Sequence, residues 1–187
     1  DDIVIGTESG NLHLFYDDGT EAPGFPFDAN ASIYSAPVIL DVDGEKIIFF
    51  GCRDYQLYAV KNNGSLHFSF TALDEINISP AILEHANNFY LFFSDDSGML
   101  YAIDTNGNEL SGWPVNVGEN EVMSESVVFS DLDGNGVVEV IAVTESSNIL
   151  VYNLDGSIYE GFPISSGFQN FSSPMVIDLD EDEDLEI

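Results

Sequence analysis

A tight turn centred on glycine recurs four times along this chain of 187 residues. The turn glycines are Gly19, Gly64, Gly107 and Gly156, so the intervals between them are 45, 43 and 49 residues. Each of them follows an Asp or Asn, and Asp-Gly and Asn-Gly pairs favour the positive φ angles of tight hairpin turns. A repeat of this length predicts a row of similar supersecondary units that pack against their neighbours, and not one irregular core.

Each repeat contains about four short apolar runs that are separated by polar turns. In the third repeat the predicted strands are Tyr90–Ser94, Met99–Asp104, Leu110–Val115 and Ser126–Ser130. The runs lack a helical period, and several are continuously apolar, which is typical of strands buried on both faces. Four antiparallel strands in every 40 to 50 residues or so indicate an all-β fold, a β-propeller of four-stranded antiparallel blades. A β-sandwich is the second architecture considered, but it has no reason to repeat at this interval.

The chain is therefore predicted to form a single β-propeller domain or segment over residues 1–187. The predicted repeats span approximately residues 2–45, 46–88, 89–139 and 140–187. These four repeats form either an arc of a larger propeller or a closed four-bladed ring, in which Pro174–Asp178 pairs beside Ile3–Thr7. The arc is favoured. Its open blade edges expose apolar surface, so we expect self-association through these edges.

A nine-residue acidic loop lies between two apolar runs and reads Asp-Leu-Asp-Gly-Asn-Gly-Val-Val-Glu. The oxygen-bearing side chains at its positions 1, 3, 5 and 9 belong to Asp131, Asp133, Asn135 and Glu139, and they can converge on one hard cation. An EF-hand begins in the same way, but it requires a bidentate Glu at position 12 and a helix on each side. Position 12 here is Ala142, and both flanks are predicted strands. The sequence therefore predicts a metal-binding loop between two strands and excludes an EF-hand.

A second acidic run of the same kind occupies Asp178–Glu186. Glu181 and Glu183 stand there where the first loop has glycines, so a solvated acidic segment is the alternative interpretation. Two other turns, Asp41–Gly44 and Glu84–Asn88, carry only the beginning of the pattern or none of it. Both are predicted to be plain hairpins.

The order of strand, acidic loop, apolar strand and hairpin resembles the FG-GAP repeats, also called VCBS repeats, of integrin α-subunit heads and many bacterial surface proteins. The stretch from Asp131 to Val143 carries the resemblance, with Glu139 in place of the usual Asp. A second stretch, from Ser97 to Trp113, resembles the blade repeat of quinoprotein-type propellers. The FG-GAP resemblance implies bound Ca²⁺. It also implies a secreted or cell-surface protein, where calcium sites with dissociation constants of roughly 10⁻⁴–10⁻³ M are common.

The same resemblance implies a set of calcium ligands for each loop. In the first loop the implied ligands are Asp131, Asp133, Asn135, the Val137 carbonyl and Glu139. In the second loop they are Asp178, Asp180, Asp182, the Asp184 carbonyl and Glu186. The first loop matches the family pattern more closely than the second.

The charge balance excludes two classes of partner. Three basic residues against 34 acidic ones give a net charge of −31. Proteins bind nucleic acids and anionic lipids through Lys and Arg, so neither is an expected partner.

No apolar run has the length of a membrane-spanning helix, so no membrane insertion is expected. The single cysteine, Cys52, excludes an internal disulfide and is predicted to be a small core residue of a strand.

A protein or glycan ligand is expected on the face opposite the calcium loops, as in related propellers. The loops predicted to form that face are Glu8–Asn11, Arg53–Gln56, Asp95–Gly98 and Glu145–Asn148, together with the connections Asp28–Tyr34, Asp74–Asn77, Gly118–Glu121 and Phe168–Phe171. The aromatic residues Tyr34, Tyr55, Phe168 and Phe171 can stack on sugars or anchor a protein there, although aromatic residues also wedge between blades.

Catalysis is not predicted for this chain. Its three histidines, His13, His67 and His85, are scattered, and none stands near a Ser and an acid at an informative spacing. We therefore expect a binding or scaffolding module, of the adhesion type, in a secreted or cell-surface protein. The alternative is the non-catalytic propeller portion of a carbohydrate-active enzyme such as a polysaccharide lyase.

Overall fold

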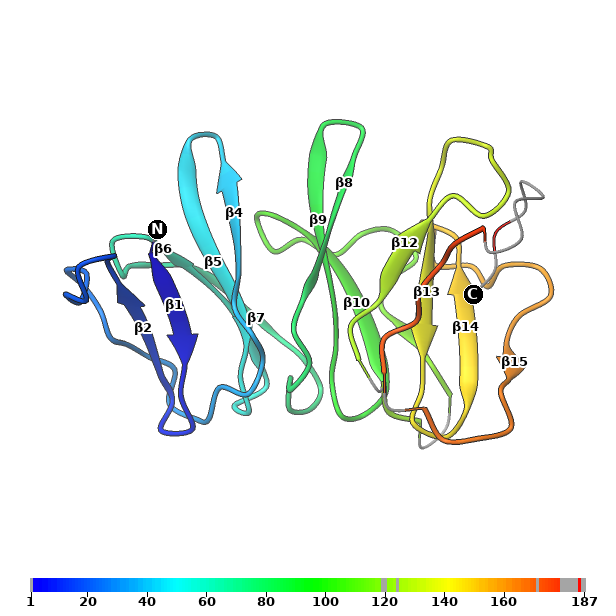
Figure 1. Cartoon of the computed structure of the whole chain (residues 1–187), viewed down its shortest axis with the longest axis horizontal. Helices are drawn as coiled ribbons and strands as arrows, with labels where there is room; N and C mark the ends of the chain where they lie inside the picture. The colour runs from blue at the N-terminus through cyan, green and yellow to red at the C-terminus, as the bar shows by residue number, and fades with distance from the viewer. Residues whose placement is uncertain (1, 119–120, 124, 171, 179–184, 186–187) are drawn as a thin grey trace.

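The chain folds into antiparallel β-sheets that follow one another along the sequence (Figure 1). A computed structural model describes residues 2–118, 121–123, 125–170, 172–178 and 185. None of these ranges forms a helix with the length and the apolar character that a membrane span requires.

Each sheet is built from short strands that are neighbours in the sequence. The first sheet contains β1 (Ile3–Gly6), β2 (Asn11–Phe15) and β3 (Phe27–Asp28). The second contains β4 (Val38–Val42), β5 (Glu45–Gly51), β6 (Gln56–Lys61) and β7 (Leu66–Thr71). The third contains β8 (Ala81–His85), β9 (Asn88–Ser94), β10 (Met99–Asp104) and β11 (Val115–Asn116). The fourth contains β12 (Val128–Ser130), β13 (Glu139–Val143), β14 (Asn148–Tyr152) and β15 (Ile164–Ser165).

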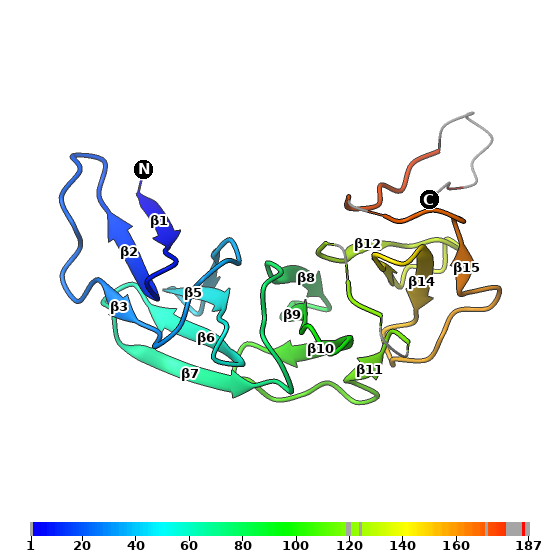
Figure 2. The same ribbon diagram turned by 90° about the horizontal axis from the view of Figure 1, so that it is seen from below.

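The four sheets stand side by side around an open arc (Figure 2). β1 and β15 lie at opposite ends of this arc, and β7 and β11 lie on its convex side. The predicted fold, a β-propeller with four-stranded antiparallel blades in the form of an arc, is thus confirmed. The alternative closed ring is not what the structure shows, because the segment that leads to Asp178 lies beyond β15 and not beside β1 (Figure 2).

Apolar clusters fill the space between successive sheets. β5 shows how one strand serves two of them, because successive side chains of a strand point to opposite faces. Ile47 and Phe49 belong to the cluster shared with the third sheet. Ile48 and Phe50 belong to the cluster shared with the first sheet. All four are at most 1% exposed, which explains why this run is continuously apolar.

One predicted strand is wrong. The outer strand of the third sheet was predicted over Leu110–Val115, but the strand that pairs with β10 there is Val115–Asn116, and before it only an isolated bridge joins Glu109 to Ile103 of β10. Gly112 just before them has a φ angle of 91°, which lies outside the strand region. Pro114 has no N–H group to donate to the ladder, so regular pairing begins only after it.

The predicted repeats are displaced by one strand from the sheets. Their boundaries near residues 46, 89 and 140 fall at the beginnings of β5, β9 and β13, each the second strand of its sheet. β1 occupies the same place in the first repeat. In the described part of the chain the first sheet therefore has no counterpart of β4, β8 and β12, the leading strands of the other three sheets.

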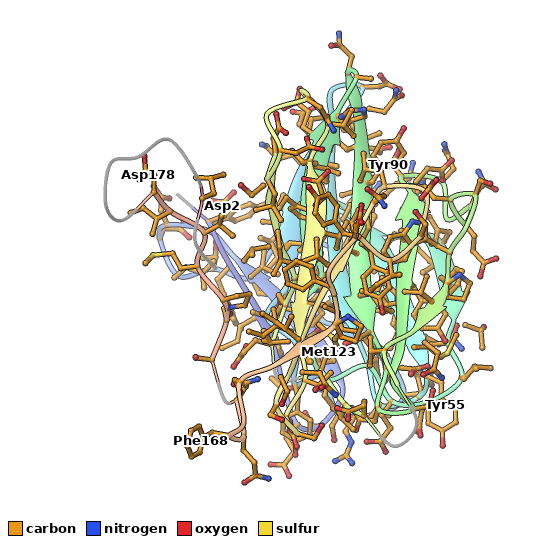
Figure 3. The ribbon with its side chains drawn as sticks, turned by 90° about the vertical axis from the view of Figure 1, so that its right-hand side faces the viewer. Asp2, Tyr55, Tyr90, Met123, Phe168 and Asp178 are labelled. Atoms are coloured by element: carbon orange, nitrogen blue, oxygen red, sulfur yellow. The ribbon has the colours of Figure 1, made fainter. Side chains whose placement is uncertain are left out.

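The loops divide between two ends of the arc. The hairpins between β4 and β5 and between β8 and β9, and the loop between β12 and β13, lie at the upper end in Figure 1, here called the hairpin end. The turns that follow β1, β5, β9 and β13 lie at the lower end, here called the turn end. Tyr55 and Phe168 lie at the turn end, away from Tyr90 (Figure 3). The loop with the best-matched metal ligands and the predicted ligand-binding loops are thus at opposite ends.

Cys52 lies directly after β5 and is fully buried. Its thiol donates to the carbonyl oxygen of Ala31 at 3.2 Å. Burial raises the pKa of this thiol to about 12. The predicted role as a small core residue is correct, although the residue stands just outside the strand.

Candidate metal centre

The loop between β12 and β13 carries the best-matched metal ligands. Ser130 and Glu139 pair across its base, so residues 131–138 protrude from the ladder. Gly134 and Gly136 have φ angles of 70° and 87°. This left-handed conformation, which glycine adopts without steric cost, folds the loop back on itself.

Backbone N–H groups of the loop point toward its carboxylates. The Asp131 carboxylate accepts hydrogen bonds from the N–H groups of Asn135 at 3.0 Å and Gly136 at 2.7 Å. The Glu139 carboxylate accepts one from the N–H of Leu132 at 2.8 Å. These bonds orient the acidic side chains, and a carboxylate oxygen that accepts one hydrogen bond keeps a lone pair for a cation.

Three of the five implied ligands of this loop converge. One oxygen from each of Asp131, Asp133 and Glu139 lies within 4.8 Å of the other two. Calcium binds oxygen at roughly 2.3–2.6 Å, so two ligands on opposite sides of one ion are about 5 Å apart. The three oxygens are therefore close enough to share one calcium ion. In the part of the chain that the structure describes, no other three acidic, His or Cys side chains come together in this way.

The remaining two implied ligands stay predictions. The side-chain oxygen of Asn135 accepts a hydrogen bond from the N–H of Val137 at 2.7 Å, which leaves it one lone pair. The Val137 side chain is exposed at the outer part of the loop.

Glu139 is the most buried acid of the loop, with 2% of its surface exposed. Burial raises the pKa of its carboxyl above the ordinary value, and the charges of Asp133 and Asp131 raise it further, although the N–H of Leu132 acts in the opposite direction. A buried carboxylate beside two others costs free energy unless a cation neutralises the group. This environment fits a bound metal ion.

Tyr159 is a neighbour of the loop that the sequence did not indicate. Burial raises the pKa of its hydroxyl, and the charges of Asp133 and Glu139 raise it further. The N–H of Tyr159 donates to the Val151 carbonyl at 2.8 Å, which holds this outer segment against β14. Only the fold brings the segment near the loop, so no spacing in the sequence could reveal it.

The second implied set of ligands lies almost entirely outside the described residues. Asp178 is described and half-buried, whereas Asp180, Asp182, Asp184 and Glu186 are not described. This set stays a prediction.

The two turns with incomplete patterns are plain hairpins, as predicted. Val42 pairs with Glu45 across the first of them, and His85 pairs with Asn88 across the second.

Aromatic side chains that were predicted to contact a ligand are exposed at the turn end. Tyr34 and Tyr55 are exposed, and Phe168 is 81% exposed. Phe171 lies outside the described residues. The Arg53 guanidinium lies over the Tyr34 ring, 5.4 Å from its centroid, so a cation already occupies one aromatic face.

The acidic residue Asp95 of the predicted ligand-binding loops is not accessible to a ligand. Asp95 is 1% exposed. Its carboxylate accepts hydrogen bonds from the N–H groups of Leu73, Asp74, Ser97 and Met99 and from the hydroxyl groups of Ser97 and Tyr101. Asp95 therefore ties the turn between β9 and β10 to the connection from the second sheet, and its role is structural.

Comparison with known proteins finds relatives in fold only. No protein-family model and no curated protein matches the chain. The C-terminal domain of PilY1 from Pseudomonas aeruginosa matches with a TM-score of 0.69 and 16% identity, over 94% of this chain and 49% of that one. BamB from Moraxella catarrhalis matches with a TM-score of 0.63 and 17% identity, over 90% of this chain and 48% of that one. BBS1N, solved in complex with ARL6DN, matches with a TM-score of 0.57 and 16% identity, over 88% and 52%.

The chain thus spans about half the length of each of these structures. Identities this low show the fold alone. They agree with the β-propeller architecture of the four sheets.

Proposed function

We propose that this chain is a calcium-stabilised β-propeller segment that serves as a binding or scaffolding module, of the adhesion type, in a secreted or cell-surface protein. The observation that carries the proposal is the convergence of Asp131, Asp133 and Glu139 at the loop between β12 and β13. In this proposal the chain is a member of the FG-GAP/VCBS repeats, and it contributes no catalytic residues.

The acidic loop acts on folding rather than on a substrate. Asp131, Asp133 and Glu139 repel one another when their charges are not neutralised. A bound calcium ion supplies the neutralising charge, and the loop residues hold it through carboxylate and amide oxygens. Because only the folded loop brings these oxygens together, calcium affinity appears as stability of the fold.

A melting experiment tests the metal assignment. With a dissociation constant of about 1 mM, about 10 mM calcium stabilises the fold by about 1.4 kcal/mol. For a protein of this size that raises the melting temperature by roughly 3–6 °C relative to EDTA. Asp131→Ala abolishes this calcium-dependent shift. Asp41→Ala is the matched control, because Asp41 begins a similar sequence in a plain hairpin, where it accepts a hydrogen bond from the Gly44 N–H.

The calcium-dependent shift is the deciding measurement. Calcium still raises the melting temperature of Asp41→Ala, even if this substitution changes the melting temperature measured in EDTA. A melting temperature that calcium and EDTA leave equal in the unsubstituted chain refutes the metal assignment.

The turn end is the face proposed for the ligand. Exposed aromatic rings lie there together with the exposed carboxylates of Glu8, Asp96 and Glu145. The one basic residue of its loops, Arg53, is paired with Glu75. Aromatic rings in acidic surroundings favour a basic protein segment or a neutral glycan over an anionic ligand. One structural neighbour, BBS1N, was solved with a protein partner, which supports a protein as the first candidate.

Glycan-array binding and protein pull-down separate the two ligand classes. Tyr34→Ala combined with Tyr55→Ala removes binding, whereas Tyr16→Ala, at an exposed tyrosine outside the turn end, does not. Equal binding by all of these variants refutes the assignment of the face. Binding to a polysaccharide without capture of a protein favours the alternative function, the non-catalytic propeller portion of a carbohydrate-active enzyme such as a polysaccharide lyase.

A further inference from the structure

A tight turn follows β1, β5, β9 and β13 at the turn end, and the same backbone hydrogen bonds recur in all four turns. In each turn the N–H of the first residue donates to the carbonyl of the fifth residue at 2.9–3.1 Å. The carbonyl of the fourth residue accepts a further hydrogen bond, at 2.8–3.0 Å, from the connection that leaves the same sheet. The fourth residues of the successive turns are Gly10, Tyr55, Gly98 and Ser147. Tyr55 differs from the other three in size.

The fourth residue has a left-handed backbone in all four turns. Its φ angle is 87° at Gly10, 82° at Gly98 and 107° at Ser147. At Tyr55 it is 71°. Glycine adopts these angles freely, whereas the Cβ atom of any other L-residue is crowded there. Among the described residues no other aromatic side chain stands at a positive φ angle, so Tyr55 is strained at a position that glycine fills without strain.

The connection passes directly over this position in the first and third sheets. A Cβ atom added to Gly10 would lie 2.7 Å from the Ala31 carbonyl oxygen. A Cβ atom added to Gly98 would lie 2.3 Å from the Glu121 carbonyl oxygen. Both contacts are too close for a real side chain, so only glycine fits in these two turns. The connection of the second sheet differs, because it leaves room for the Tyr55 side chain.

Packing within the chain does not account for the strain at Tyr55. This residue is 45% exposed, and it lies at the turn end (Figure 3). Its side chain makes no hydrogen bond and no ring contact with the residues that the structure describes. Strained residues concentrate at sites where the unusual backbone angle serves a function. Here the turn holds an aromatic ring in reach of a ligand.

A second tyrosine of the turn end shows what such a ring binds. The Arg53 guanidinium lies over the Tyr34 ring, 5.4 Å from its centroid, and pairs with the Glu75 carboxylate. The face of an aromatic ring attracts cations, and a nearby carboxylate strengthens the attraction. No basic side chain of the described residues lies over the Tyr55 ring. Tyr55 therefore offers the same chemistry to a cation from outside the chain.

An exposed leucine is a close neighbour of Tyr55 along the backbone. The N–H of Ala72 donates to the Tyr55 carbonyl at 2.8 Å, and the next residue is Leu73. Leu73 is 70% exposed. Lys and Arg side chains pack their aliphatic stems on apolar surface while the charged head stays in water. A ring and a leucine on adjacent backbone segments suit such a stem.

Acidic residues border the same place. Asp74 follows Leu73 in the connection. The N–H of Asp96, in the turn of the next sheet, donates to the Glu75 carbonyl at 2.9 Å, which brings a further exposed acid to this connection. Glu75 already pairs with Arg53, the one basic residue of these loops. The negative charge that remains favours a cationic ligand and repels an anionic one.

We propose that Tyr55 anchors the ligand at the turn end and that the group it binds is an arginine or lysine side chain in a basic segment of a partner protein. This inference rests on the proposed function, which places the ligand at the turn end, and it adds the residue and the chemistry. The cationic head lies over the Tyr55 ring near Asp74 and Asp96. The aliphatic stem packs on Leu73. A neutral glycan stacks on the ring without gaining from the carboxylates, so the charges favour the basic segment.

Melting temperatures test the strain at Tyr55 without any ligand. Tyr55→Gly and Tyr55→Ala both remove the ring, but only glycine relieves the left-handed angle. The relief exceeds the extra entropy that glycine loses on folding, so we expect Tyr55→Gly to melt about 2–4 °C above Tyr55→Ala. Tyr16 is the matched control, because it is an exposed tyrosine without a positive φ angle, and there the glycine variant melts no higher than the alanine variant. The same order at both positions contradicts the strain and overturns the argument for Tyr55.

Fluorescence anisotropy with a labelled peptide of alternating glycine and arginine tests the ligand class. In 0.15 M sodium chloride charge attraction reaches only about 8 Å, so direct contacts decide the affinity. We expect Tyr55→Gly to raise the dissociation constant about fivefold, which corresponds to the loss of one cation–ring contact. Tyr55→Phe keeps the ring and stays within about twofold of the unsubstituted chain. Tyr16→Gly removes an exposed ring elsewhere and leaves the dissociation constant unchanged.

Three results overturn the inference. Equal dissociation constants for the unsubstituted chain, Tyr55→Gly and Tyr16→Gly show that the peptide binds through charge alone. Displacement of the peptide by maltohexaose shows that the ring takes a neutral glycan. Weaker binding in Tyr34→Ala but not in Tyr55→Gly keeps the turn end as the ligand face and moves the anchor to Tyr34, so this inference and the proposed function fail separately.

Discussion

Replacement of Asp95 by asparagine exchanges one oxygen of a buried carboxylate for an NH₂ group. The Oδ2 atom accepts hydrogen bonds from the N–H groups of Leu73 at 3.0 Å and Asp74 at 3.2 Å, and from the Tyr101 hydroxyl at 2.8 Å. An NH₂ group in that place donates and cannot accept, so it faces two backbone donors. The substitution therefore disturbs the junction between the second and third sheets.

The loss in free energy of unfolding depends on which hydrogen-bond donors find a new acceptor. The Tyr101 hydroxyl can rotate and accept from the NH₂ group, and it already lies 3.1 Å from the N–H of Leu73. The N–H of Asp74 is left without an acceptor, which costs about 1–3 kcal/mol. The remaining hydrogen bonds lose the charge of their acceptor, which costs about 1 kcal/mol more. We expect Asp95→Asn to lower the free energy of unfolding by about 2–4 kcal/mol and the melting temperature by roughly 4–16 °C.

Thermal melting followed by circular dichroism measures this effect. Asp96→Asn is the matched control, because it makes the same chemical change and the same change in net charge at the next residue, which is exposed. We expect the control to stay within about 0.5 kcal/mol of the unsubstituted chain. If both variants melt together, the hydrogen bonds to Asp95 do not hold the sheets, and the reasoning is refuted.

Three further substitutions probe individual contacts by urea unfolding. Burial opposes ionisation of the Asp104 carboxyl, but hydrogen bonds from nearby backbone and side chains lower its pKa in the folded chain below the ordinary value of 3.8. Asp104→Asn therefore lowers the free energy of unfolding at pH 7. The loss in stability shrinks as the pH falls from 3.8 through the lowered pKa of the folded chain. A difference that is independent of pH contradicts this. Gly112→Ala costs at least about 3 kcal/mol, because its φ is 91° and its Cβ would lie 1.7 Å from the Asp155 carbonyl oxygen; an unchanged midpoint disproves the close approach. Trp113→Phe costs about 1–2 kcal/mol, since its indole N–H donates to the Leu154 carbonyl at 2.9 Å; full stability would show that this hydrogen bond is dispensable.

The repeated turns predicted the architecture because their cause is local. Asp-Gly and Asn-Gly pairs favour hairpin turns wherever they stand, so the spacing of these turns reports the length of each unit. What Gly64 and Gly156 contact is not local. Both meet the Gly-aromatic-Pro segment of the preceding sheet, and that contact depends on how the sheets stack. Periodicity in the sequence therefore predicted the units but not the atoms that join them.

Asp95 and the segment Leu110–Val115 show where local reasoning fails. Asp95 stands in an acidic turn at the predicted ligand-binding end, and only the fold reveals that backbone and hydroxyl donors from two loops surround it. Leu110–Val115 has apolar residues of the right number for a strand, but the positive φ of Gly112 interrupts the pairing with β10 between the bridge at Glu109 and the strand that begins at Val115. A tertiary contact determines the role of Asp95, and a backbone angle determines where the strand begins. Neither can be read from the local sequence.

For the acidic loop, the sequence predicted more of the site than it did in these two cases. The spacing of Asp131, Asp133 and Glu139 predicted a shared cation from the sequence, and the structure brings one oxygen of each within 4.8 Å of the other two. The burial of Glu139 could not be predicted, because it depends on the position of β13 between neighbouring layers. That burial makes an unneutralised loop costly, and it adds to the spacing a physical reason for metal binding.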